Sequence, residues 1–284
     1  MNLILRYTLG TAASLLVAPI ALNAQIFVSD DFSLRGSITD GDILEGTAAQ
    51  FSSSGSPTYN SSNGTTITTM RYHVRGSDTL AVPNYNNNAT VASNSIEVID
   101  MPTTGPVRME AVALPSGSWG AGVSGMFVGL TDSDTPGLQN NIGTGAEHVS
   151  ARFITDGGGA GRVNLQTYDG VNEVDSFSPA GDAVTFNSSH EYLVALDYDF
   201  DTLNVVASLE NLNTSESTSI STTLGDSVTL SYAQFDITGT DGTGTAANTS
   251  GFSSYAVAIP EPSTLALIGG AASLCFVLLR RKRG

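Results

Sequence analysis

Apolar and polar residues alternate with a period of two in several short runs of this chain. Residues 70–75 read Met-Arg-Tyr-His-Val-Arg, and residues 126–130 and 192–198 repeat the alternation. Successive side chains of a strand point to opposite faces, so each run predicts a strand with one apolar face. No stretch between residues 25 and 260 has a sustained helical period with capping residues. The body of the chain is therefore predicted to be all-β.

Two pairs of these runs predict β-hairpins. The run Val149–Phe153 is followed by a glycine-rich turn and then by Val163 and Leu165. The run 192–198 leads through Asp199-Phe200-Asp201 into the run 203–209. Further strands are expected over 228–232 and 252–259. About ten short strands at such spacing indicate a single two-sheet antiparallel sandwich.

Charge and cysteine content exclude several classes of function. Between Gln25 and Ile259 there are 6 Arg and 26 Asp or Glu, a net charge of −20, and the only lysine and the only cysteine are Lys282 and Cys275. A body without a basic patch is not expected to bind nucleic acid. A body without cysteine holds neither disulfides nor a cysteine-based zinc or iron–sulfur site.

The two ends of the chain have the composition of targeting segments. Residues 1–24 contain one early positive charge, a short apolar run and a small residue at Ala24, which predicts a secretory signal peptide. An apolar segment, 265–279, precedes a basic cluster at the C-terminus and predicts a transmembrane helix with its basic end in the cytoplasm. The expected organisation is a signal peptide (1–24), an exported β-sandwich (25–258) and a C-terminal membrane segment (259–284).

This C-terminal segment resembles the PEP-CTERM sorting signal of Gram-negative bacteria that make exopolysaccharide. The resemblance consists of Pro260-Glu261-Pro262, an apolar helix and a terminal basic cluster of Arg280, Arg281, Lys282 and Arg283. It implies that an exosortase recognises Pro260, Glu261 and Pro262 and that the basic cluster stops transfer across the membrane. The protein would then be anchored in the inner membrane as an intermediate and delivered to the cell surface or extracellular matrix.

The body is similar to concanavalin A-like (laminin-G-like) jelly rolls, from the opening Asp30-Asp31-Phe32-Ser33 and the closing run 252–257. This resemblance implies a function that involves carbohydrate, either binding it or cleaving it. Laminarinase-like sandwiches carry Glu-x-Asp-x-(x)-Glu on one strand, whereas Glu173-Val174-Asp175-Ser176-Phe177-Ser178 lacks the second glutamate. The histidines His73, His148 and His190 are interpreted as strand-face or surface residues. No catalytic residue and no enzymatic activity are predicted.

Two acidic clusters and two aromatic residues are the candidate ligand sites. Calcium is a candidate ligand of Asp132 and Asp134, and of Asp197, Asp199 and Asp201, because clustered carboxylates at a turn supply part of its oxygen shell. Solvated acidic turns that discourage edge pairing are the alternative. The only tryptophan, Trp119, is either a sugar platform or a core residue, and Tyr85 is a second candidate for sugar binding.

The Ser/Thr-rich stretches 52–69 and 213–223 are expected to be solvated loops or glycan-bearing surfaces. The sequence as a whole predicts a non-enzymatic exported protein that an exosortase sorts and that associates with exopolysaccharide or the cell envelope. A divergent polysaccharide hydrolase or lyase and a self-assembling surface adhesin are the alternatives.

Overall fold

The computed structural model describes residues 25–35, 44, 46–61, 67–68, 70–75, 78–83, 91–115, 125–134, 146–155, 159–238 and 250–260, without the side chains of residues 33, 61–93 and 238. Residues 26–258 form one compact unit. The predicted signal peptide, residues 261–284, Trp119 and Tyr85 lie outside the described residues. No helix of the described part is long and apolar enough to cross a membrane.

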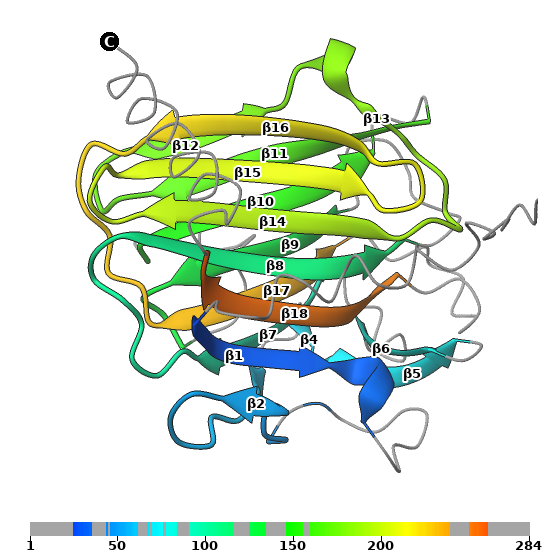
Figure 1. Cartoon of the computed structure of the whole chain (residues 1–284), viewed down its shortest axis with the longest axis horizontal. Helices are drawn as coiled ribbons and strands as arrows, with labels where there is room; N and C mark the ends of the chain where they lie inside the picture. The colour runs from blue at the N-terminus through cyan, green and yellow to red at the C-terminus, as the bar shows by residue number, and fades with distance from the viewer. Residues whose placement is uncertain are drawn as a thin grey trace, which may run out of the picture. The chain divides into compact units, whose positions relative to one another are not determined.

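Two nine-stranded sheets pack face to face, which confirms the predicted two-sheet antiparallel jelly-roll sandwich (Figure 1). The front sheet runs in the order β16 (Glu216–Thr223), β15 (Asn204–Asn211), β14 (Tyr192–Asp199), β8 (Pro106–Leu114), β18 (Gly251–Ile259), β1 (Gln25–Asp31) and β2 (Phe51–Ser52), with β6 (Asp78–Pro83) beside β18 and β5 (Met70–Arg75) beside β6. The back sheet runs β12 (Glu173–Phe177), β11 (Ala160–Tyr168), β10 (His148–Thr155), β9 (Gly125–Thr131), β17 (Tyr232–Thr238), β7 (Val91–Glu97) and β3 (Asn60–Ser61), with β13 (Val184–Thr185) beside β11 and β4 (Ile67–Thr68) parallel to β7.

Both predicted hairpins form. In the back sheet β10 pairs with β11, with Val149 opposite Thr167 and Phe153 opposite Val163. In the front sheet β14 pairs with β15, with Tyr192 opposite Asn211. Two short 3-10 helices, η2 (Phe32–Leu34) and η4 (Ala180–Asp182), are the helical elements of the described residues.

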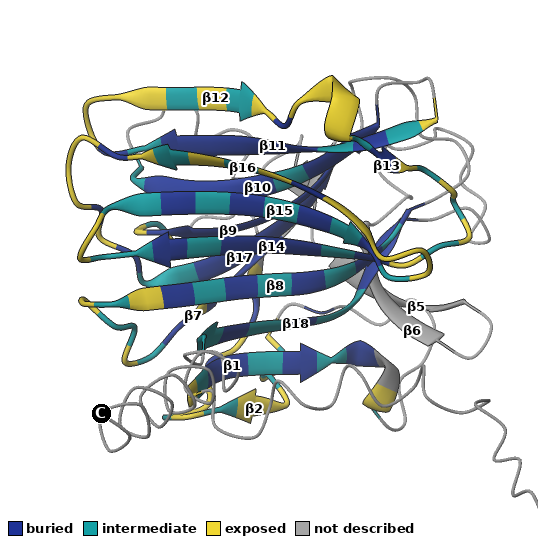
Figure 2. Ribbon diagram, turned by 45° about the horizontal axis from the view of Figure 1, so that its top comes forward, coloured by how far each residue is buried: buried dark blue, intermediate teal, exposed yellow. Residues whose placement is uncertain are grey.

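The core lies between the sheets, where the alternating apolar side chains are buried (Figure 2). Phe153 of the back sheet contacts Tyr192 of the front sheet, with ring centroids 4.7 Å apart. Because side chains alternate along a strand, this contact directs Val149, Ala151 and Phe153 inward. His148, Ser150 and Arg152 therefore lie on the outer face of the back sheet.

A second group of buried aromatic rings surrounds Phe235 at the other side of the core. Its ring centroid lies 5.9 Å from Tyr59 and 5.3 Å from Tyr255. Tyr59 donates a hydrogen bond to Asp30 (2.7 Å), and Arg35 forms an ion pair with the same buried carboxylate. Burial is the main cause that raises the pKa of Tyr59, and Tyr255 and Asp30 add to it.

Three expectations about secondary structure are wrong. The Ser/Thr-rich stretch 52–69, expected to be a loop, contains the short strands β3 and β4, which both pair with β7. Residues 216–223 form the edge strand β16, paired with β15 along its whole length, and not a loop. Its inward position Thr218 is 5% exposed, while serines occupy outward positions. An edge strand buries little area, so Ser and Thr serve it as well as apolar residues do. Conversely, Val228 and Leu230 are buried in an extended connection, and β17 begins only at Tyr232.

Candidate functional site

The predicted sorting residues begin where the sandwich ends. Strand β18 ends at Ile259, and Pro260 is the last described residue after it. Glu261, Pro262 and the basic cluster 280–283 lie outside the described residues. The sandwich thus completes its last strand immediately before the predicted recognition segment.

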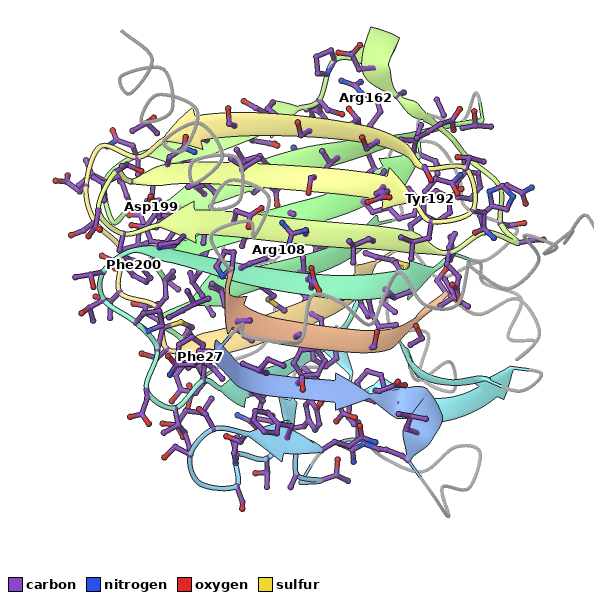
Figure 3. The ribbon with its side chains drawn as sticks, in the orientation of Figure 1. Phe27, Arg108, Arg162, Tyr192, Asp199 and Phe200 are labelled. Carbon is purple, nitrogen blue, oxygen red and sulfur yellow. The ribbon has the colours of Figure 1, made fainter. Side chains whose placement is uncertain are left out.

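The three aspartates around the β14–β15 turn serve three different purposes. Asp197 accepts a hydrogen bond from Arg108 (2.7 Å) on the outer face of the front sheet. Burial raises the pKa of Asp197, and Arg108 opposes that rise. Asp199, at the end of β14 beside Phe200 in Figure 3, accepts hydrogen bonds from the amides of Asp201 (2.8 Å) and Thr202 (3.2 Å). The side chain of Asp201 is exposed in the turn.

The other predicted pair, Asp132 and Asp134, lies just after β9. The backbone carbonyl of Asp134 accepts hydrogen bonds from Ser95 (2.7 Å) and Asn60 (3.2 Å). Asp134 also borders a pocket of 320 Å³ together with Tyr232 of β17, residues 95–97 of β7, Asn60 of β3 and residues 56–58. Across the described ranges, no group of three or more His, Cys, Asp or Glu side chains is placed to hold a metal ion. Calcium binding stays a prediction.

The strongest candidate site lies on the outer face of the back sheet. Here His148, Ser150 and Arg152 of β10 face Tyr168, Gln166 and Asn164 of β11 in register. The next strand, β12, places Glu173, Asp175 and Phe177 opposite the same β11 residues. We call His148, Arg152, Asn164, Gln166 and Phe177 the polar patch. Sequence analysis identified none of them as ligand-binding.

Several buried polar atoms of the polar patch have no hydrogen-bond partner within the described residues. They are His148 Nε2, Arg152 Nε, Asn164 Oδ1 and Gln166 Oε1. His148, Asn164 and Gln166 are 0%, 0% and 5% exposed. Leaving a buried polar group unpaired costs about 1–3 kcal/mol. Such groups on one face call for an explanation, and a bound ligand is one.

The hydrogen bonds that do form in the polar patch show whether each unpartnered atom is a donor or an acceptor. Nδ1 of His148 lies 3.1 Å from the carbonyl oxygen of Ala146, so Nδ1 carries the proton and Nε2 is an acceptor. Burial is the main cause that lowers the pKa of His148, which keeps the ring neutral. Asn164 donates through Nδ2 to Asp175 (2.6 Å) and to the carbonyl of Ser176 (2.9 Å). Its free Oδ1 is therefore an acceptor.

Arg152 adds a cation beside these three acceptors. Its guanidinium carbon lies 4.8 Å from the centroid of Phe127, the residue opposite it on β9. A Cβ atom on Gly125 would lie only 2.3 Å from Arg152 Nε, so a side chain there would displace the arginine. Burial lowers the pKa of Arg152, and Asp175 offsets that effect in part. The patch therefore contains three buried acceptors and one half-buried cation.

An aromatic residue forms the edge of the same patch. Phe177 is 43% exposed on β12, opposite Asn164. Arg162 lies over the Phe177 ring, 5.5 Å from its centroid, and donates through Nε to the carbonyl of Ser178 (2.8 Å). An exposed ring beside polar groups suits a ligand with apolar faces and hydroxyl edges.

Glu173 and Asp175, the two acids of the incomplete laminarinase-like pattern, share the outer face of β12. Both lie on an exposed edge strand, and Asp175 is already hydrogen-bonded to Asn164. The third position of the pattern is Phe177 or, with the optional residue, Ser178, and neither is a glutamate. The sequence could have indicated the polar patch through the residues between the apolar ones of His148–Thr155, but only the register places them beside Gln166 and Asn164.

Comparison with known proteins finds similarity of fold and of one terminal motif. No curated protein matches the sequence. The CBM2 module of the evolved Dit protein of Lactobacillus casei BL23 phage J-1 is 9% identical, with a TM-score of 0.49 over 84% of this chain and 96% of that one. Lectin I of Ulex europaeus is 9% identical (TM-score 0.48; 81% and 97%), and an endo-1,3-beta-glucanase of Streptomyces sioyaensis is 13% identical (TM-score 0.44; 84% and 96%).

The terminal motif is the specific finding among these comparisons. Residues 258–283 match the model of the PEP-CTERM protein-sorting motif. This range covers Pro260, Glu261, Pro262 and the basic cluster, as predicted. The motif implies export and membrane-associated sorting, and the chain joins it to a jelly-roll sandwich.

Proposed function

We propose that this protein is a non-enzymatic component of the cell surface or extracellular matrix that binds a polysaccharide. An exosortase recognises the PEP-CTERM motif and releases the sandwich from the inner membrane. The polar patch then binds glycan hydroxyl groups. The observation that carries the binding function is the set of buried, unpartnered acceptors on His148, Asn164 and Gln166.

Hydroxyl groups are the donors that three acceptors on adjacent strands require. From His148 to Arg152 the patch extends four residues along β10, or about 13 Å at ~3.3 Å per residue. A chain of hydroxyl-bearing rings can supply donors over that distance, and Phe177 offers a ring on which an apolar sugar face can stack.

Binding is tested with a glycan array and the full-length chain in detergent. Gln166→Met keeps the side-chain volume and removes a free acceptor, so we expect weaker glycan binding without loss of folding stability. Gln234→Met is the matched control on the same face, because Gln234 Nε2 donates to the carbonyl of Ser133 (3.0 Å). If no glycan on the array binds the wild-type chain, the proposed binding function is wrong.

Sorting is tested in cells by removing residues 259–284. We expect the shortened chain to lose membrane retention and processing, because the recognition segment and the membrane segment are both gone. Glu261→Ala should block processing alone, and Glu191→Ala, at an exposed site of the sandwich, should leave it unchanged. Unchanged processing of the shortened chain would contradict the sorting role.

A polysaccharide hydrolase or lyase is the alternative, and the shared face of Glu173 and Asp175 is the observation in its favour. Release of reducing ends or unsaturated products from any bound glycan, abolished by Glu173→Gln, would replace the non-enzymatic proposal. We expect no turnover, because Asp175 accepts a hydrogen bond from Asn164 and neither Phe177 nor Ser178 supplies the second glutamate.

A self-assembling adhesin is a second candidate, favoured by β16. This edge strand has eight residues, seven of them Ser, Thr or Ile, and its one charge is Glu216. Such an edge can pair with a strand of another molecule. Light scattering of the full-length chain tests it, and a monodisperse monomer would contradict self-assembly.

A further inference from the structure

Arg152 differs from the other arginines whose side chains the structure describes. Arg35 is paired with Asp30, Arg108 with Glu110 and Asp197, and Arg162 with the carbonyl of Ser178. Arg152 makes no hydrogen bond or ion pair with a described residue, and its buried Nε is without a partner. Cations that are even partly buried are normally paired, so this half-buried guanidinium is unusual.

Two neighbours fix the position of Arg152 without neutralising it. The ring of Phe127 supports one face of the guanidinium, and the missing side chain of Gly125 leaves room for Nε. Asp175 is the acid whose charge acts on Arg152, but it lies two strands away on β12, opposite Gln166, and forms no ion pair with Arg152. Its Oδ1 already accepts from Asn164. The cation is therefore held in place and not satisfied.

The geometry of a guanidinium limits what can satisfy it. Nε is buried at the position of the missing Gly125 side chain, so the two terminal nitrogens form the planar edge that can match the two oxygens of a carboxylate. Around it, the free acceptors Asn164 Oδ1 and Gln166 Oε1 require hydroxyl donors. A ligand that meets both requirements carries carboxylate and hydroxyl groups on the same ring.

We infer that the polar patch binds an acidic, carboxylate-bearing glycan, with Arg152 recognising the carboxylate. This inference rests on the proposed glycan-binding function and names its ligand class. The net charge of −20 between Gln25 and Ile259 repels a polyanion at long range. At about 0.15 M salt the Debye length is ~8 Å, so the contact with Arg152 acts while most of that repulsion is screened.

The test is calorimetry of the full-length chain in detergent at ~0.15 M salt. The probes are oligomers of galacturonate, mannuronate and glucuronate, the same oligomers after reduction of their carboxyl groups, and a sulfated neutral oligomer. Wild type should bind at least one uronate oligomer about 10- to 100-fold more tightly than its reduced form, as expected for a charged hydrogen bond. Arg152→Met should abolish that preference.

Arg108→Met is the control, because Arg108 lies on the front sheet, away from the polar patch, and is already paired with Glu110 and Asp197. It should keep the preference. Arg152→Lys retains the charge but lacks the planar edge, so it should reduce the preference for the uronate oligomer over its reduced form. Because this variant keeps a cation at the same position, a reduced preference reports on recognition and not on loss of folding.

Equal affinity for a uronate oligomer and its reduced form, or binding of neutral glycans only, would overturn the inference and leave the proposed function standing. Equally tight binding of the sulfated oligomer would overturn carboxylate recognition. Binding of no glycan of any kind would overturn the proposed function itself.

Discussion

Two arginines of this protein lie against aromatic rings, and their surroundings differ in one respect. Arg35 lies 5.8 Å from the centroid of Tyr59, and Arg152 lies 4.8 Å from that of Phe127. Arg35 also donates to Asp30 Oδ1 (2.9 Å) and to the carbonyl of Ala48 (2.6 Å). Arg152 has no such partner among the described residues.

The difference separates a structural charge from one available to a ligand. The carboxylate of Asp30 is fully buried, so Arg35 and Tyr59 compensate a charge that the interior could not otherwise hold. On the back sheet Arg152 is held in position and feels the charge of Asp175, but it forms no ion pair with any residue that the structure describes. Removing Arg35 should therefore lower the folding stability, whereas removing Arg152 should weaken ligand binding and change the folding stability little.

Arg35→Met should have the largest effect on stability. Without its cation the buried carboxylate of Asp30 is uncompensated, so we expect a loss of about 3 kcal/mol in the free energy of unfolding. Urea denaturation of the full-length chain in detergent measures it. Arg108→Met, which removes a partly exposed arginine from the front sheet, is the control and should lose about 1 kcal/mol or less. Similar losses in both variants would contradict the distinction.

Gly125→Ala tests how closely the back sheet holds Arg152. The new Cβ would lie 2.3 Å from Arg152 Nε, so we expect a loss of about 1–3 kcal/mol from overpacking. Adding Arg152→Ala should recover most of it, which a double-mutant cycle detects. Gly181→Ala is the control, because no atom lies within 4 Å of its Cβ position. Purely additive effects would contradict the contact.

Arg152→Met should change stability by less than about 1 kcal/mol in either direction. The variant loses the contact of the half-buried guanidinium with Phe127, about 0.5–2 kcal/mol, but it also removes a charge that has no ion-pair partner among the described residues. Denaturation curves of wild type and variant measure the difference. A loss above about 2 kcal/mol would indicate that the cation has a structural partner, as Arg35 has.

The pH dependence of stability should report on His148. Its folded-state pKa is lowered, mainly by burial, although the carbonyl of Ala146, Glu173 and Asp132 act in the opposite direction. Below about pH 6.5 the unfolded chain binds a proton at this ring that the folded chain does not bind. Stability should therefore fall as the pH drops from about 6.5 toward the folded-state pKa. His148→Gln should have a shallower pH profile, and identical profiles would contradict neutral burial.

The sequence period was sufficient to predict the strands that have one strongly apolar face. It was insufficient to predict strands whose buried residues are weakly apolar or polar. Phe153, Leu196 and Leu209 follow a clear alternation, and both predicted hairpins formed. The central strand β8 was not predicted, because two of its four inward residues, Ala111 and Ala113, are only weakly apolar. Strand β16 was assigned to a loop because its polar residues give no apolar period.

The polar patch could not be predicted, since its members come from three strands. His148 and Arg152 share a face only because they are four residues apart on a strand, and that spacing is visible in the sequence. Their juxtaposition with Asn164, Gln166 and Phe177 depends on the β10–β11 and β11–β12 registers. A shift of one residue would have placed the opposite set of side chains on this face.

By itself the sequence determined the fold class, the acidic and cysteine-free body, and the PEP-CTERM motif at residues 258–283. The apolar period of a strand and the order of residues in the C-terminal motif are local properties, so both can be read from the sequence without knowing which residues are in contact. Only the tertiary structure decided which charges are compensated. Whether an arginine meets a carboxylate depends on residues far away in the chain, as the pairing of Arg108, labelled on the front sheet in Figure 3, with Asp197 shows. Arg152 meets none among the described residues, and that absence is the physical basis of the proposed ligand site.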